Sequence, residues 1–310
     1  MADLVDGCKL QMRGSLTARE QDSQMLPTHG LGKMYLPPSI QEGADMLLRL
    51  ERSRSCVYGS WLDNAQQISH AQRASIAVFA GPNGSGKRTL AKSLAFDLQR
   101  LVKLVHVADL VSASSLGDTL HHLNAAIADA KLSDAVIVLD GFEHVMIEEG
   151  GGASGEAGIK IHILLSRLLD CLFLFPGLVL LICHIDGPQN ISLQRNFATK
   201  LSAFVRFANP PYDVRAKLWE DFLPKKAPVS KALSFIELGR KFDLNPGSIR
   251  SAVARAAAEA FARGSHQLDH SNSNGAAIIE IRQKDLLLAG EQEVAKLRDG
   301  NFDLVSKLFT

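Results

Sequence analysis

The sequence predicts an α/β protein with a doubly wound, parallel, five-stranded sheet, followed by a smaller helical domain. Three observations lead to this fold class. Short apolar runs alternate with amphipathic, helix-like stretches from Ser75 onward. The segment 81–89 has the glycine-rich pattern of a phosphate-binding loop, a P-loop. After Pro210-Pro211 the pattern is helical over roughly 100 residues, which is enough for a second domain.

Each strand is expected where an apolar run is bounded by polar or turn-forming residues. The expected strands cover residues 75–80, 101–108, 135–140, 178–185 and 203–208. Helical periodicity between them predicts crossover helices at residues 86–100, 117–130 and 159–172. Since neighbouring parallel strands need crossovers of this kind, the alternation favours βαβ units.

The regions that flank the sheet differ from it in pattern. Residues 1–40 show no sustained periodicity and predict a flexible leader, and residues 41–73 predict a helical lead-in. The nucleotide-binding α/β domain is expected at 74–209 and the helical domain at 210–310. Within the latter, we expect helices at 212–223, 230–241, 247–263 and 284–298, and a short strand at 277–281.

Composition narrows the classes of partner. The 310 residues are 46% hydrophobic and 22% charged, which is typical of a globular protein with a sizeable core. The formal net charge of +1 gives no overall attraction to nucleic acid or to an anionic membrane, so neither is expected as a partner. The apolar stretch 168–185 is divided by Asp170 and Pro176-Gly177, which predicts buried core instead of a membrane span. Scattered cysteines and an N-terminus without an apolar segment predict a cytoplasmic protein.

The segment 81–89 lies between an expected strand and an expected helix, as a phosphate-binding loop must. Its candidate nucleotide-binding residues are Gly81, Pro82, Asn83, Gly84, Ser85, Gly86, Lys87, Arg88 and Thr89. The glycines allow backbone N–H groups to surround an anion, the following helix directs its positive end at it, and Lys87 adds a charge. Arg88 stands where such loops have a Ser or Thr that holds Mg²⁺. ATP or ADP is the expected ligand, and Mg²⁺ is a second candidate that Arg88 places in doubt.

A second group of candidates follows the expected strand 135–140. Asp140 ends this strand and is the candidate metal ligand, because a carboxylate there would orient metal-bound water. Gly141 stands where many ATPases have the glutamate that positions the attacking water. The next carboxylate is Glu143, a candidate catalytic residue if it substitutes for that glutamate. The alternative is that Glu143 is a surface carboxylate or one that begins a helix.

Several landmarks carry a family resemblance. They are Leu36-Pro-Pro38, Tyr58 with Trp61, the phosphate loop, Leu116-Gly-Asp-Thr119, Asp140, Trp219 with Leu223-Pro224 and Ala227-Pro228, and Pro246-Gly-Ser-Ile-Arg250. With these landmarks the chain resembles an AAA+ ATPase over roughly residues 35–300. More narrowly, it resembles the bacterial AAA ATPases found beside contractile injection and phage-tail-like clusters.

The resemblance implies further site residues. Arg250 matches the lid arginine that reaches the γ-phosphate, so the helical domain would be a lid. Asp186 stands where the family has an asparagine that polarises the attacking water. Lys200, after Thr199, stands at the arginine-finger position as a candidate catalytic residue, and lysine keeps the charge but loses the bidentate fork. The resemblance also implies a homo- or hetero-oligomeric ring.

These substitutions lead to two hypotheses about function. The first is an AAA+-type ATP-binding protein with weak or lost ATP hydrolysis, acting as a nucleotide-dependent structural or regulatory subunit. The alternative is an active AAA+ ATPase that remodels a protein substrate, with Glu143 and an unaligned arginine, for which Arg195 and Arg206 are nearby in the sequence, compensating for the losses. A small-molecule kinase is a more remote reading, against which the helical domain and Arg250 argue.

Overall fold

The computed structural model describes residues 24–25, 27–56, 74–111, 116–143, 166–185, 198–270 and 280–299. Its contacts divide the chain into two compact units, the first carrying a β-sheet and the second the helices that follow Ala208. Several expected features lie wholly or partly outside the described residues: the first part of the leader, residues 57–73 of the lead-in with Tyr58 and Trp61, residues 159–165 of the third crossover helix, Asp186, and residues 277–279 of the short strand. No helix among the described residues has both the length and the apolar character needed to cross a membrane.

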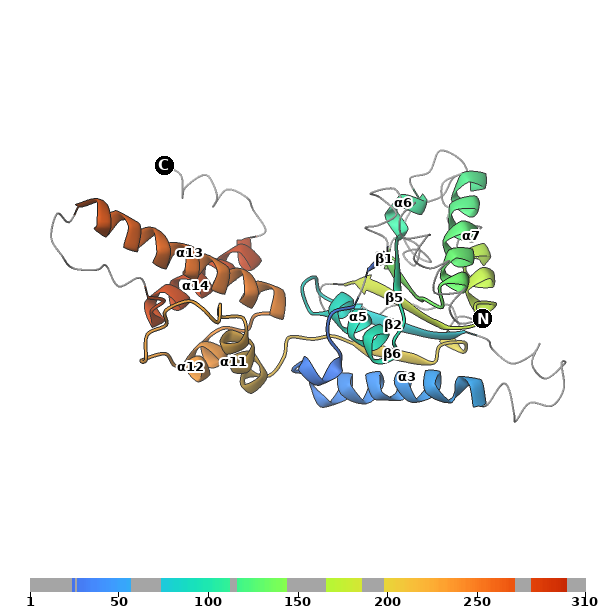
Figure 1. Ribbon diagram of the computed structural model, residues 1–310, viewed down its shortest axis with the longest axis horizontal. Coiled ribbons are helices and arrows are strands. Elements are labelled where there is room, and N and C mark those ends of the chain that lie inside the picture. Colours follow the sequence, from blue (N-terminus) through green and yellow to red (C-terminus); the bar gives the residue numbers. More distant parts are fainter. Residues whose placement is uncertain are drawn as a thin grey trace, which may run out of the picture. The chain divides into compact units, whose positions relative to one another are not determined.

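The first unit is built on a six-stranded sheet in the order β1-β3-β4-β5-β2-β6 (Figure 1). The strands are β1 (Gln24–Met25), β2 (Ser75–Gly81), β3 (Val102–His106), β4 (Val136–Asp140), β5 (Leu178–His184) and β6 (Ala203–Arg206). The strands β2 to β6 pair in parallel, which confirms the predicted five-stranded parallel sheet. The two-residue β1, which the sequence analysis did not predict, adds an antiparallel edge to β3.

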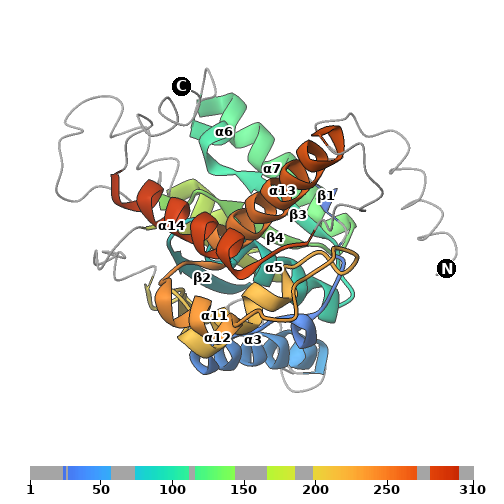
Figure 2. The ribbon, with the colours of Figure 1, turned by 90° about the vertical axis from the view of Figure 1, so that its left-hand side faces the viewer.

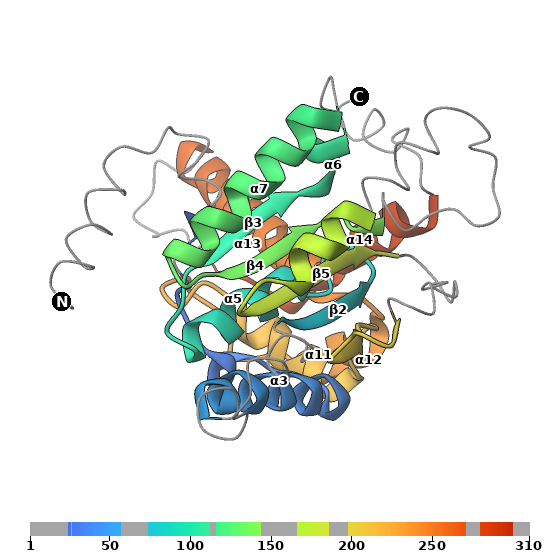
Figure 3. The same cartoon turned by 90° about the vertical axis from the view of Figure 1, so that its right-hand side faces the viewer.

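Helices cover both faces of this sheet (Figure 3). The elements are η1 (Leu31–Lys33), α3 (Pro38–Cys56), α5 (Lys87–Asp97), α6 (Val107–Val111) and α7 (Leu116–Leu132), with a further helical segment at 166–173. Helix α7 and segment 166–173 pack on one face. Helices α3 and α5 contact β2 and lie on the other face. The sheet is thus doubly wound, as its alternating sequence pattern predicts.

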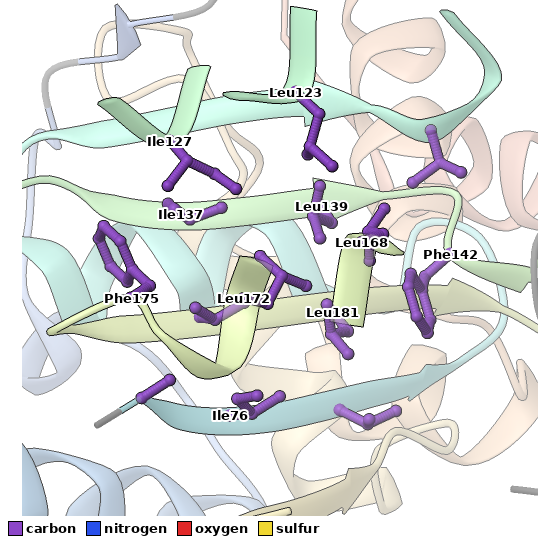
Figure 4. Packing of buried hydrophobic residues seen from close by; sticks show 14 of the residues in the cluster. Ile76, Leu123, Ile127, Ile137, Leu139, Phe142, Leu168, Leu172, Phe175 and Leu181 are labelled. Atoms are coloured by element: carbon purple, nitrogen blue, oxygen red, sulfur yellow. The ribbon is translucent and has the colours of Figure 1, made fainter. Parts of the chain in front are cut away.

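A hydrophobic core lies between one face of the sheet and the helices that cover it, α7 and segment 166–173 (Figure 4). Its members are alternate residues of the strands and one side of each helix, since successive strand residues point to opposite faces. The labelled residues are Ile76, Leu123, Ile127, Ile137, Leu139, Phe142, Leu168, Leu172, Phe175 and Leu181. This packing fixes the carboxyl ends of β4 and β5, where the candidate site residues lie.

A buried carboxylate ties α3 to the loops that precede the strands. The Glu51 side chain is fully buried, and its two oxygens accept hydrogen bonds from Arg54 Nη2 at 2.5 Å and Arg100 Nη1 at 2.7 Å. Arg54 also donates to Ser75 Oγ, at the start of β2. Burial alone would raise the pKa of Glu51, but the hydrogen bonds from Arg54, Ser75 and Arg100 and the Arg54 charge outweigh it and lower the pKa.

The second unit contains four labelled helices, which Figure 2 shows from the side of this unit. They are α11 (Tyr212–Asp221), α12 (Phe235–Lys241), α13 (Pro246–His270) and α14 (Gln283–Asp299). Helices α13 and α14 pack against each other, and α11 packs against α12. The fully buried Trp219 of α11 lies in the core that these helices share. Two ion pairs, Arg255–Glu293 and Arg263–Asp285, also join α13 to α14.

Three expected elements of this unit differ from the structure. Helix α13 continues to His270 instead of ending at residue 263. Helix α12 begins at Phe235 instead of residue 230, because the Ser234 side chain caps it by accepting a hydrogen bond from the Glu237 N–H. Of the strand expected at 277–281, the structure describes residues 280–281, and Ile281 forms an isolated parallel bridge with Val229.

Candidate nucleotide-binding site

The phosphate loop leaves β2 at Gly81 and enters α5 at Lys87. Gly81 has φ of 155°, and a Cβ there would lie 2.3 Å from the carbonyl oxygen of Phe207, the residue after β6, so this close approach requires glycine. Gly84 and Gly86 have φ values of 76° and 99°, a region that glycine enters without strain. The helix N-terminus that follows is a favourable place for an anion.

The Lys87 side chain contacts the first two residues of the phosphate loop. Its Nζ atom donates to the carbonyl oxygens of Gly81 at 2.7 Å and Pro82 at 2.6 Å, and its side chain is buried. These bonds hold the ammonium group beside the N-terminus of α5, where its charge adds to that of the helix dipole. The structure therefore brings the lysine and the glycines of the predicted loop together.

Arg88 forms an ion pair with Asp140. Asp140 is buried at the end of β4, and both of its carboxylate oxygens have partners. His184 Nε2 lies 3.0 Å from Oδ1, and His106 Nδ1 lies 3.5 Å from Oδ2, the oxygen that Arg88 contacts. Three nitrogen-bearing side chains thus converge on one carboxylate.

The ionised form of Asp140 is favoured by these partners. Burial by itself would raise the pKa of Asp140, but the hydrogen bond and charge of Arg88, with smaller effects of His184, outweigh burial and lower the pKa. Asp140 is therefore a carboxylate at neutral pH, and it is held by cationic and N–H groups of the protein itself.

The residues around Asp140 do not fit Mg²⁺. Mg²⁺ in such sites is held by one or two carboxylates together with phosphate oxygens and water, and Asp140 is already in contact with Arg88, His184 and His106. A guanidinium about 4 Å from a cation is repelled by about 4 kcal/mol for each unit of charge at an effective dielectric constant near 20. Arg88 therefore opposes a divalent ion at this carboxylate, and the role of Asp140 as a metal ligand stays a prediction.

The chain turns sharply directly after Asp140. Gly141 has φ of 80°, and the N–H groups of Gly141 and Phe142 both donate to the Ile182 carbonyl of β5. Phe142 is fully buried in the core. Glu143 therefore lies at the end of β5, where its Oε2 accepts a hydrogen bond from the His184 backbone N–H at 2.8 Å.

Cys183 lies on β5 between Ile182 and His184, and its thiol is unreactive. Burial, with a smaller contribution from the negative charge of Glu143, raises the pKa of the Cys183 thiol to about 12. A thiol with this pKa is protonated at neutral pH and is a poor nucleophile.

Other predicted site residues have identifiable surroundings. The Lys200 ammonium lies 4.0 Å from the centre of the Phe173 ring, a cation–π contact at the surface of the first unit. In the second unit, the Arg250 guanidinium lies 4.8 Å from the centre of the Phe222 ring. In the matched Gly-Asp-Thr segment, Thr119 is buried and donates to the Leu110 carbonyl, so it fixes the start of α7.

Two histidines that contact Asp140, His106 and His184, were not predicted as site residues. His106 and His184 are the last residues of β3 and β5, the two strands that flank β4. In the register of the sheet, His106 lies directly beside Asp140. Polar residues that end neighbouring parallel strands would have been a usable signal, because those ends meet at one edge of the sheet.

Comparisons with known proteins agree with this geometry. Residues 77–184 match the model of the ATPase family associated with various cellular activities (AAA). No curated protein matches the chain.

Solved structures share the fold at low sequence identity. A katanin structure described for its self-assembly has a TM-score of 0.62 and 16% identity, covering 88% of each chain. The FIGL-1 AAA domain has a TM-score of 0.66 and 15% identity, covering 88% of this chain and 86% of that one. The same domain in complex with ADP has a TM-score of 0.65 and 14% identity, covering 88% and 87%. The predicted α/β fold class is therefore confirmed, and residues 77–184 of the first unit are similar to the AAA family model.

Proposed function

We propose that the protein binds ATP or ADP as an AAA+ module in which ATP hydrolysis is weak or lost. In this proposal, nucleotide acts as a structural or regulatory ligand. The phosphate loop supports nucleotide binding through its glycine conformations and the buried Lys87. The similar FIGL-1 AAA domain was solved with ADP, which adds support for the ligand class.

The turn at Gly141 is the main observation that supports a loss of ATP hydrolysis. A water-positioning carboxylate would follow Asp140 directly, but that position holds a glycine in the left-handed region. The following residue, Phe142, is committed to the core. Misplacement of a catalytic group by about 1 Å can already cost about 100-fold in rate, so a carboxylate two residues further along is a poor replacement.

The arginine-finger position adds a second loss. Lys200 lies over the Phe173 ring and cannot form a bidentate contact with a phosphate as arginine does. Loss of a finger arginine costs roughly 10³ to 10⁵ in turnover in related phosphoryl-transfer systems. Together with the turn at Gly141, this change supports slow or absent hydrolysis.

One observation favours the alternative of an active, protein-remodelling ATPase. The Glu143 carboxylate is held by the His184 N–H, and the His184 side chain contacts Asp140. Glu143 therefore lies next to a residue that contacts the site. In this reading, rotation of the Glu143 side chain would allow it to orient a water molecule.

A ring of like or mixed subunits is the assembly that we propose. The katanin structure in the comparison was described for self-assembly, and it shares this fold. In a mixed ring, a hydrolytically competent partner would tolerate the losses at Gly141 and Lys200.

A single-turnover experiment tests the proposal. The protein, in excess over radiolabelled ATP, is incubated, quenched and analysed for ADP by chromatography. We expect bound ATP to be recovered intact, with ADP formation no faster than in the Lys87→Ala variant. ADP formation that the wild type supports and Lys87→Ala abolishes would show the active ATPase instead.

A further inference from the structure

We infer that this site takes its nucleotide as the metal-free polyphosphate, with the Arg88 guanidinium in place of Mg²⁺. The inference rests on the proposed nucleotide binding and names the species that binds. It follows from the position of Arg88, which contacts the one carboxylate that the sequence offers as a metal ligand.

Positively charged side chains are concentrated at the start of α5. Lys87, Arg88 and Lys92 lie within the first two turns of this helix. Burial and the nearby positive charge of Arg88 lower the pKa of Lys92, so the cations of this helix face act on one another. The helix N-terminus adds its own partial positive charge. This end of α5 supplies the positive charge that a polyphosphate needs.

The Asp140 carboxylate is already in contact with groups of the protein itself. Its oxygens already contact Arg88, His184 and His106. A divalent cation would have to displace Arg88 from the carboxylate and then remain beside its positive charge. Mg²⁺ also gives up its water ligands reluctantly, which makes such a displacement less favourable still.

Arg88 is exposed enough to contact a ligand. Its side chain is 46% exposed, whereas the carboxylate that it contacts is 5% exposed. A side chain that is nearly half exposed can contact a ligand in addition to Asp140. Guanidinium groups match phosphate oxygens in a bidentate geometry. Arg88 would then bridge Asp140 and the phosphates, as a metal ion does in other phosphate loops.

The inference has a direct consequence for Mg²⁺. A metal-free triphosphate carries more negative charge than its Mg²⁺ complex, so it gains more from Lys87 and Arg88. Mg²⁺ in solution would lower the concentration of the species that binds. ATP binding should therefore be as tight or tighter in EDTA than in excess Mg²⁺, which is the reverse of a metal-dependent phosphate loop.

The test is calorimetric titration of the full chain with ATP in EDTA and in excess Mg²⁺. We expect equal or tighter binding of wild type in EDTA. Arg88→Thr should bind roughly ten- to a hundredfold more weakly in EDTA, because a charge-assisted hydrogen bond is lost, and should gain affinity when Mg²⁺ is added. Arg167→Thr, which changes an exposed arginine of segment 166–173, is the matched control and should behave as wild type.

The outcomes separate this inference from the proposed function. Wild-type binding that needs Mg²⁺ would overturn the inference and leave nucleotide binding standing. The absence of binding in both media would overturn the proposed function. Because the wild-type comparison needs no variant, a folding defect in Arg88→Thr would not prevent a decision.

Discussion

At the residue scale, Gly141 shows how one backbone conformation can exclude a catalytic group. Its φ of 80° brings two consecutive N–H groups to the Ile182 carbonyl. We expect Gly141→Ala to destabilise the protein by about 1–2 kcal/mol, because a side chain is unfavourable in the left-handed region. Denaturant unfolding measures the change, with Gly32→Ala as control, since a Cβ at Gly32 meets nothing within 4 Å. Equal stability of wild type and Gly141→Ala would contradict the assigned turn.

The same conformation affects any attempt to restore hydrolysis. A glutamate introduced by Gly141→Glu would have to adopt the same left-handed backbone or disrupt the turn that places Phe142 in the core. We expect Gly141→Glu combined with Arg88→Thr to be less stable than Arg88→Thr alone and to remain inactive. Thermal unfolding and phosphate release, measured on the same samples, check this. A stable double variant with steady turnover would show that the turn is not the obstacle.

Nucleotide affinity is expected to depend on Lys87. We expect Lys87→Ala to abolish measurable ATP binding, because the variant loses the cation that the loop holds next to the α5 N-terminus. Calorimetry measures the affinity, and Lys131→Ala, at an exposed position of α7, is the control. Unchanged affinity in Lys87→Ala would rule out the phosphate-loop assignment.

The sequence predicted some of these residues and not their partners. Gly81–Thr89 and Asp140 follow local patterns, a glycine-rich turn before a helix and a carboxylate at the end of an apolar strand. The ion pair of Arg88 with Asp140 depends on the order of strands in the sheet, which places β2 and β4 on either side of β5. Strand order is a tertiary property, and a single sequence does not encode it as a local pattern.

At the element scale, the burial of Glu51 explains how α3 is held to the sheet. We expect Glu51→Gln to destabilise the protein by about 3 kcal/mol, the low end for a broken buried ion pair, because Arg54 and Arg100 keep some contact with solvent. Urea unfolding at neutral pH measures the loss. Glu42→Gln, at an exposed position of the same helix, is the control and should change stability little.

The Glu51 cluster also predicts a pH dependence. The folded-state pKa of Glu51 is lower than its ordinary value of 4.5, so folding favours the ionised form. Its stabilising contribution is therefore complete above about pH 4.5 and is lost as the pH falls through the folded-state pKa. The stability difference between wild type and Glu51→Gln should shrink on acidification. A difference that stays constant down to the acid transition would contradict this role.

Most elements were predictable because their patterns are local. Strands β2, β4 and β5 are continuous apolar runs, and their observed ends differ from the predicted ones by at most one residue. Helix α12 was placed too early because the Ser234 cap competes with several other polar residues as a start signal. Strand β1 escaped prediction because two residues carry no periodicity, and its pairing with β3 depends on tertiary contact.

For the whole molecule, we expect nucleotide to control the assembly of the proposed ring. If a ring forms with nucleotide between subunits, sedimentation velocity should show larger species with ATP than without it. Lys87→Ala should not respond to ATP, because it lacks the ligand that the assembly requires. A response in Lys87→Ala equal to that of wild type would separate assembly from this site.

We propose that the protein retains nucleotide binding and has lost hydrolysis. The most direct measurement is calorimetric titration of the full chain with ATP, followed by phosphate determination on the same sample. We expect saturable binding with no phosphate released above the Lys87→Ala background. Saturable binding accompanied by steady phosphate release would contradict it and would show that Glu143, or another carboxylate, completes a working ATPase.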